Sequence, residues 1–149
     1  MKTINQQPNF QCIDAIKVSL SIEEAGSAFY KKAAKKVENP RVQKMFKRLA
    51  EGEKDHIRSL KEKARFLQPV LPKKSGIVDR AVAKKISDEV FPQLEDIDFK
   101  SDFEVIDLGI ESEKRTIKAL NFLMEAEKKI DVRVIFMHLI VEEKRHLLA

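Results

Sequence analysis

The chain has 149 residues, of which 36% are charged, with a net charge of +5 and a single cysteine, Cys12. One cysteine excludes an internal disulfide and any zinc or iron–sulfur site built from paired cysteines. Four glycines, no tryptophan and many lysines and glutamates favour helices over sheets. We therefore expect one all-α domain over residues 1–149, long enough to bury its own core.

No apolar segment is long enough to cross a bilayer, and the first residues lack the apolar core of a signal peptide, so we expect a cytoplasmic protein. Basic residues are concentrated in residues 1–90 and acidic residues in 91–149. The lysines of the first part are not interleaved with aromatic residues, so nucleic-acid binding is not expected. The opposed charges of the two parts are compatible with a homodimer.

Apolar periodicity predicts four long helices. We expect them from about Phe10 to Val37, from Pro40 to about Leu67, from Ser101 onward, and from Asp131 to Ala149. Asn39 and Pro40 supply a cap and a first helical residue, and the short turn before them makes the first two helices antiparallel. Residues 68–100 contain three prolines and a glycine but can form a short helix from Ile77 to about Val90. Such a long connection is typical of a crossover, which lets the third long helix run parallel to the second.

The second helix carries a polar pair on its apolar face. Glu53 and His56 interrupt a row of apolar residues spaced three and four apart, which marks the buried side of a helix. A lone buried carboxylate would cost several kcal/mol or bind a proton, so Glu-x-x-His on an inward face suggests a cation. The same phrase returns in the fourth helix at a fixed offset of 90 residues, as Glu143 and His146.

The repeat predicts further inward acids. Glu23 lies on the apolar face of the first helix and Glu113 on that of the third, at the same offset, which indicates an internal duplication. Their neighbours Glu24 and Glu111 belong to polar rows. In the third helix, the expected inward row is Phe103, Ile106, Ile110, Glu113, Ile117, Leu120 and Met124.

Four glutamates converging in a bundle would repel strongly, since two like charges about 4 Å apart cost roughly 4 kcal/mol at an effective dielectric constant near 20. Two divalent metal ions would cancel their charge. One imidazole per metal and no thiolate favour iron or manganese over structural zinc. We therefore expect two iron ions, with manganese or zinc as substitutes, in a bundle of the ferritin-like pattern.

Four phrases carry a family resemblance: SIEEAGSAFYKKAA, LAEGEKDHI, IESEKRTIKAL and VEEKRHL. Together they resemble the rubrerythrin branch of the ferritin-like superfamily, over essentially the whole four-helix core. The resemblance implies a ferritin-like four-helix bundle with a long crossover between helices two and three. It also implies that Glu53 and Glu143 bridge two irons, that Glu23 and His56 complete one iron, and that Glu113 and His146 complete the other.

Tyr30 lies on the same helix face as Glu23. In the family a tyrosine here hydrogen-bonds a ligating carboxylate, which supports a role in orienting the metal ligands. The alternative is a core tyrosine without such a role. The repeat-equivalent position is Leu120, so only one half of the site has a phenol.

Two features depart from rubrerythrins. The chain has no rubredoxin domain with four cysteines, so electrons must come from a separate donor such as a rubredoxin-like protein. Thr116 stands where the family carries an additional glutamate.

The leading hypothesis is a di-iron oxidoreductase that reduces a small oxidant, hydrogen peroxide or dioxygen, at a site of four glutamates and two histidines. Two alternatives stay open. One is a ferroxidase or iron-handling protein, and the other is a non-catalytic metal-binding bundle, since the fold alone does not choose among these activities.

Overall fold

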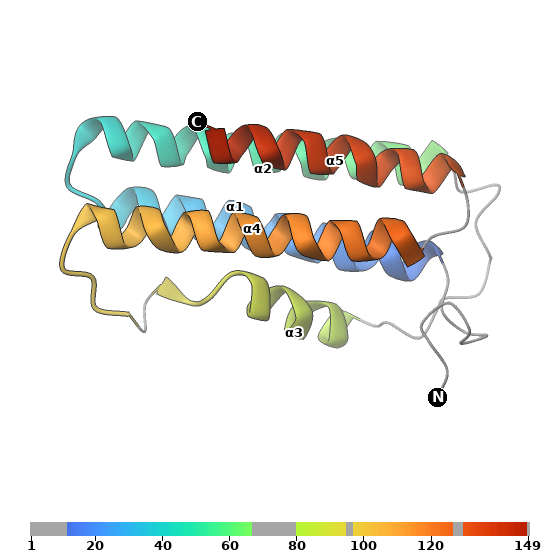
Figure 1. Ribbon diagram of the computed structural model, residues 1–149, viewed down its shortest axis with the longest axis horizontal. Coiled ribbons are helices and arrows are strands. Elements are labelled where there is room, and N and C mark those ends of the chain that lie inside the picture. Colours follow the sequence, from blue (N-terminus) through green and yellow to red (C-terminus); the bar gives the residue numbers. More distant parts are fainter. Residues whose placement is uncertain (1–11, 67–79, 95–96, 127–129, 149) are drawn as a thin grey trace.

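The computed structural model describes residues 12–66, 80–94, 97–126 and 130–148. Its helices are α1 (Cys12–Lys36), α2 (Pro40–Phe66), α3 (Arg80–Val90), α4 (Asp102–Ala126) and α5 (Ile130–Leu148). Figure 1 shows α1, α2, α4 and α5 as aligned long helices, with α3 beside them. The predicted all-α four-helix bundle is confirmed. The predicted start of α3 at Ile77 lies outside the described residues, and α5 begins one residue before the expected cap, Asp131.

The turn between α1 and α2 reverses the chain and is held at both ends. The Asn39 side chain accepts a hydrogen bond from the Arg41 amide over 2.8 Å, as a helix cap does. Asp102, the first residue of α4, accepts hydrogen bonds from the amides of Glu38 and Asn39, each over 3.0 Å. The start of α4 is therefore fixed to the α1–α2 turn, and α4 runs parallel to α2 as predicted (Figure 1).

The crossover helix α3 folds back on the bundle of its own chain, where it contacts mainly α1. The hydroxyls of Ser21 and Ser87 lie 3.1 Å apart across that contact. On the other side, Arg115 of α4 donates to the carbonyl of Val90 over 3.0 Å. These bonds place the residues that follow α3, including Phe91, against the centre of the bundle.

The prediction for the inward face of α4 was wrong at two positions, because Phe103 is 76% exposed and Ile110 is 38% exposed. The buried side of α4 also contains small and polar residues, which an apolar pattern does not count. It consists of Val105, Gly109, Ser112, Glu113, Thr116, Leu120 and Leu123. Small residues let neighbouring side chains approach the α4 backbone, so the buried face is rotated relative to the apolar row.

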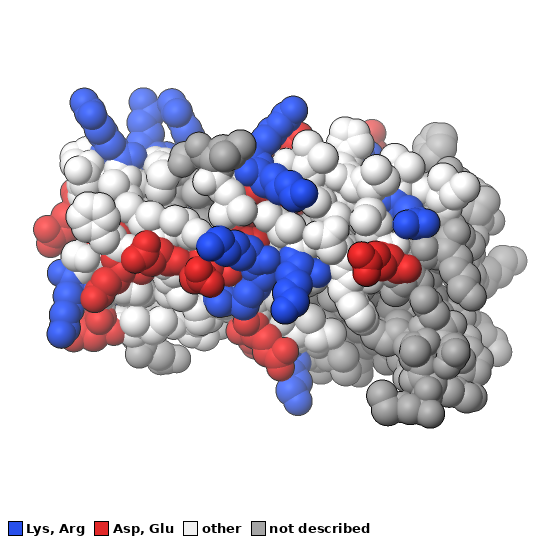
Figure 2. Space-filling view, viewed as in Figure 1, with Lys and Arg blue, Asp and Glu red and all other residues white. Residues whose placement is uncertain are grey.

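The large apolar side chains that are exposed among the described residues all belong to α4 and α5. They are Phe103, Ile110, Phe122, Ile130, Val134, Met137 and Val141. Figure 2 shows this face of the molecule, with acidic side chains gathered over the N-terminal part of α4. Within the described residues, no helix combines the length and apolar character needed to span a membrane.

Candidate metal centre

The four long helices bring all six predicted metal ligands to the middle of the bundle. The four glutamates are at most 3% exposed. Glu23 comes from α1, Glu53 and His56 from α2, Glu113 from α4, and Glu143 and His146 from α5. Ligand atoms from these residues form two groups, in each of which all atoms lie within 4.8 Å of one another.

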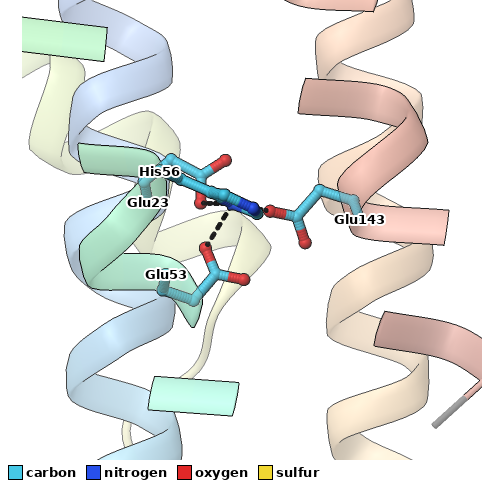
Figure 3. A group of neighbouring side chains, drawn as sticks. All are labelled: Glu23, Glu53, His56 and Glu143. Carbon is cyan, nitrogen blue, oxygen red and sulfur yellow. Dashed lines mark hydrogen bonds and ion pairs between the residues drawn. The ribbon is translucent and has the colours of Figure 1, made fainter. Parts of the chain in front are cut away.

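The first group surrounds the His56 ring. Figure 3 shows the carboxylates of Glu23, Glu53 and Glu143 pointing toward this imidazole from three helices. His56 Nδ1 lies 3.3 Å from Glu23 Oε2, 3.7 Å from Glu53 Oε2 and 3.0 Å from Glu143 Oε1. One nitrogen therefore faces three carboxylate oxygens. Together these four atoms form a donor set that can bind a single divalent cation.

The second group surrounds His146 in the same way. His146 Nδ1 lies 3.1 Å from Glu53 Oε1, 3.3 Å from Glu143 Oε2 and 3.8 Å from Glu113 Oε1. The rings of His56 and His146 are nearly parallel, with centroids 5.2 Å apart and an interplanar angle of 9°. The two groups thus share Glu53 and Glu143 and differ in the third carboxylate, which is Glu23 in the first group and Glu113 in the second.

Several buried polar atoms of the cluster have no hydrogen-bond partner among the described residues. They are Glu23 Oε1, Glu53 Oε1, Glu113 Oε2, Glu143 Oε2 and His146 Nδ1. A buried carboxylate oxygen without a partner costs on the order of 1–3 kcal/mol or more. Four of the five atoms are such oxygens and the fifth is an imidazole nitrogen, so all are metal-ligand types and the cluster fits a pair of bound cations.

The pKa values of the ligand residues show how charge is balanced in the metal-free cluster. Burial disfavours the charged imidazole, but the neighbouring carboxylates outweigh burial and raise the pKa of His56 to about 10 and that of His146 to about 11. Burial and the nearby Glu143 carboxylate raise the pKa of Glu113 to about 8. Without metal, protons bound to these groups therefore offset the negative charge of the carboxylates.

Tyr30 contacts one half of the cluster. It is 1% exposed, and its hydroxyl donates a hydrogen bond to Glu113 Oε1. Burial and the Glu113 charge raise the pKa of Tyr30 well above its usual value, so the hydroxyl stays protonated as a donor. The bond engages one oxygen of Glu113 and leaves Oε2 without a partner. The predicted contact between Tyr30 and a carboxylate of the cluster is present.

Two glycines that were not predicted as part of the site, Gly26 and Gly52, lie against the cluster. A Cβ atom on Gly52 would lie 3.0 Å from His146 Nε2, and one on Gly26 would lie 3.1 Å from the Phe91 ring and 3.4 Å from the Glu53 carboxyl carbon. Glycine in the middle of a helix costs roughly 0.5–1 kcal/mol relative to alanine, so its presence there signals a close approach. That signal was available at Gly52, directly before Glu53.

A four-helix bundle whose core holds four glutamates and two Glu-x-x-His pairs defines the class of dinuclear carboxylate metalloproteins. The family model for rubrerythrin matches residues 14–149. The chain therefore belongs to the rubrerythrin family, as the sequence phrases indicated.

One solved structure shares the fold. It is described as a dodecameric thioferritin in the bacterial domain, the bacterioferritin-related protein from Bacteroides fragilis. The TM-score is 0.72 at 19% sequence identity, and the match covers 92% of this chain and 80% of the other. This likeness confirms the ferritin-like bundle. None of the curated proteins compared with the chain matches it.

Proposed function

We propose that the protein is a di-iron oxidoreductase that reduces hydrogen peroxide, with dioxygen as the second candidate oxidant. The observation that carries the proposal is that Glu53 and Glu143 each direct one oxygen to each histidine. Two carboxylates arranged in this way can bridge two metal ions. In the proposed site, one ion is completed by Glu23 and His56, and the other by Glu113 and His146.

The bound metal pair would supply two electrons to the oxidant and recover them from a donor. The balanced reaction is H2O2 + 2 H⁺ + 2 e⁻ → 2 H2O, in which the O–O bond breaks and each oxygen leaves as water. The protein residues set the metal separation, neutralise charge and exclude bulk water. Buried carboxylate oxygens without hydrogen-bond partners are suited to this task because they already lie in the core, where they can bind cations.

Tyr30 is proposed to position Glu113 rather than to react. Its hydroxyl bonds Glu113 Oε1, the oxygen that also faces His146, so the bond would hold the orientation of the Glu113 carboxylate as a metal ligand. Aromatic rings hold the phenol in place, because the Phe46 ring stacks on it at a centroid distance of 5.9 Å and the Phe29 ring meets it edge-on at 5.4 Å.

The electron donor is proposed to be a separate protein, such as a rubredoxin-like protein. The 149 residues include one cysteine, so a four-cysteine iron site is not among them. The donor must deliver two electrons for each peroxide.

Anaerobic titration tests the proposal. Protein loaded with two ferrous ions and mixed with one equivalent of hydrogen peroxide should be fully oxidised, with the near-ultraviolet absorption of an oxo-bridged diferric site. Ferric protein should then accept two electrons from reduced rubredoxin. Failure of one equivalent of peroxide to oxidise the diferrous protein would overturn the function.

The alternative is iron oxidation and storage, and the fold likeness to a dodecameric thioferritin is the observation that raises it. Storage requires a closed shell. Sedimentation showing a small oligomer, together with iron binding that stops near two ions per chain, would exclude it. Binding of zinc but no redox-active iron would instead favour the non-catalytic bundle.

A further inference from the structure

A small pocket adjoins one half of the metal centre. Its volume is about 70 Å³, and it lies between α2, α4 and the end of α5. Its inner surface includes Tyr30, Glu113 and His146. Its outer wall is made of apolar side chains, namely Met45, Leu49, Ile106, Ile110 and Leu147.

The pocket reaches the surface on one side and the ligands on the other. Ile110 is 38% exposed, whereas Tyr30 and Glu113 are buried. The side chain of His146 keeps 14% of its surface exposed and that of His56 keeps 10%, so the two halves of the cluster differ in which residues line the pocket rather than in exposure. Glu23 and His56 do not line this pocket. Access through it is therefore to the Glu113–His146 half.

We propose that this pocket is the entry path for a small neutral oxidant to the metal position of Glu113 and His146, and that its apolar wall selects against larger hydroperoxides and against ferrous ions. The proposal rests on the proposed function, since it specifies the substrate class of that site. Leu49 and Gly109 line the pocket and can be varied to change its size.

The size of the pocket and the apolar character of its wall are the basis for the proposed preference for hydrogen peroxide. A water molecule needs on the order of 10–15 Å³ of pocket volume, so the pocket holds several water-sized molecules, and hydrogen peroxide is close to water in size. The outer wall offers no charged side chain or amide to replace the water around an entering cation, so passage of a hydrated ferrous ion is unfavourable. A tert-butyl group is bulkier than hydrogen peroxide and has to pass between the apolar side chains of the outer wall.

Gly109 offers a way to narrow the pocket without a clash. A Cβ atom there would lie 3.6 Å from Phe46 and 3.8 Å from both Phe29 and Tyr30, which are ordinary contact distances. Gly109→Ala should therefore fold normally, and alanine is also the better helix former. Leu49→Ala widens the pocket from α2. Leu108→Ala is its control, because Leu108 is half-buried against the core but does not line the pocket.

Stopped-flow oxidation of the diferrous protein measures the selection. Leu49→Ala should raise the rate with tert-butyl hydroperoxide relative to hydrogen peroxide by about tenfold, the effect of relieving a modest steric barrier, and Leu108→Ala should not. Gly109→Ala should slow oxidation by hydrogen peroxide several-fold while ferrous ion uptake keeps its rate. Equal slowing of ferrous uptake would overturn the exclusion of cations.

Xenon provides a readout that does not depend on bound metal. Crystals of the metal-free protein under xenon pressure should show one atom beside Gly109, and this site should be lost in Gly109→Ala. Absence of xenon there, or relative rates that do not respond to Leu49→Ala, would overturn the entry path. If hydrogen peroxide fails to oxidise even the unchanged diferrous protein, the proposed function fails and the entry path fails with it. Oxidation that is normal but insensitive to the pocket variants removes the entry path alone.

Discussion

Glu53 and Glu143 face each other across the bundle and divide their oxygens between the same two histidines. Glu53 places Oε2 3.7 Å from His56 Nδ1 and Oε1 3.1 Å from His146 Nδ1. Glu143 places Oε1 3.0 Å from His56 and Oε2 3.3 Å from His146. This arrangement distinguishes the two shared carboxylates from Glu23 and Glu113, each of which lies near one histidine.

Replacing a shared carboxylate should remove both metal ions, whereas replacing an unshared one should remove only one. We expect Glu143→Ala to bind fewer than one metal ion per chain after iron loading, and Glu23→Ala to keep about one. Removing one partner of a buried ion pair costs about 3–5 kcal/mol, and Glu143 would pair with both metal ions whereas Glu23 would pair with one. Metal analysis of the desalted proteins measures this. Glu24→Ala, an exposed neighbour of Glu23, is the control and should bind two. Two metals bound to Glu143→Ala would contradict the bridging assignment.

Tyr30→Phe should weaken the metal at the Glu113 half while leaving the fold intact. It removes a hydrogen bond to a charged group, worth about 1.5–3 kcal/mol, which corresponds to about 10- to 100-fold in affinity. Competition with a chelator should resolve one weakened and one unchanged metal. Equal weakening of both metals would show that Tyr30 acts on the whole core instead of positioning Glu113.

Gly52→Ala should displace the His146 ring, since the new methyl group would lie 3.0 Å from Nε2. We expect a lower affinity for one metal ion, although alanine is the better helix former by about 1 kcal/mol. Gly109→Ala is the matched control, because its methyl group meets only ordinary contacts. Calorimetric titration compares them, and identical affinities in the two variants would refute the steric argument.

Metal binding should release protons at neutral pH. His56 and His146 have pKa values of about 10 and 11 in the metal-free cluster, so both are protonated at pH 7 and must lose a proton to bind metal. Titration calorimetry in buffers of different ionisation enthalpy should detect this release, and an enthalpy that does not depend on the buffer would contradict it.

The raised pKa values of the same residues predict how the stability of the metal-free protein depends on pH. A histidine whose pKa is raised from 6.5 in the unfolded chain to about 10 stabilises the fold fully below pH 6.5, and this contribution is lost as the pH rises through 10. The raised pKa of Glu113 acts in the same direction. The melting temperature of the metal-free protein should therefore fall from pH 6.5 to 10, by more than that of the metal-loaded protein.

The exposed apolar face of α4 and α5 is predicted to be the contact of a homodimer. Acidic residues on α4 (Glu104, Asp107 and Glu111) and basic residues on α5 (Arg133, Lys144 and Arg145) are all exposed, so a two-fold axis can bring opposite charges together around the apolar side chains. Met137→Lys should shift the protein to monomer in sedimentation velocity. Gln93→Lys, at an exposed residue outside α4 and α5, should stay dimeric. A wild-type monomer at micromolar concentration would contradict the prediction.

The helices and the members of the cluster could be predicted because their signals are local. A glutamate or histidine at the spacing of a buried helical face is visible in the sequence, and the repeat offset confirmed the choice of Glu113. The inward face of α4 was harder, because Gly109, Ser112 and Thr116 are buried without being apolar, whereas Phe103 and Ile110 are apolar without being buried. Burial of such residues depends on which neighbours approach, and that information lies far away in the sequence.

By itself, the sequence determined that four helices form and that each carries an acid on its buried side, because helical periodicity is a property of neighbouring residues. The tertiary structure decided how those acids meet. It gave Glu53 and Glu143 an oxygen for each histidine, directed Tyr30 to Glu113, packed α3 on α1 and placed an apolar pocket beside only one half of the cluster. These features arise from packing between distant segments, in which ångström-scale distances depend on side chains that no local pattern records.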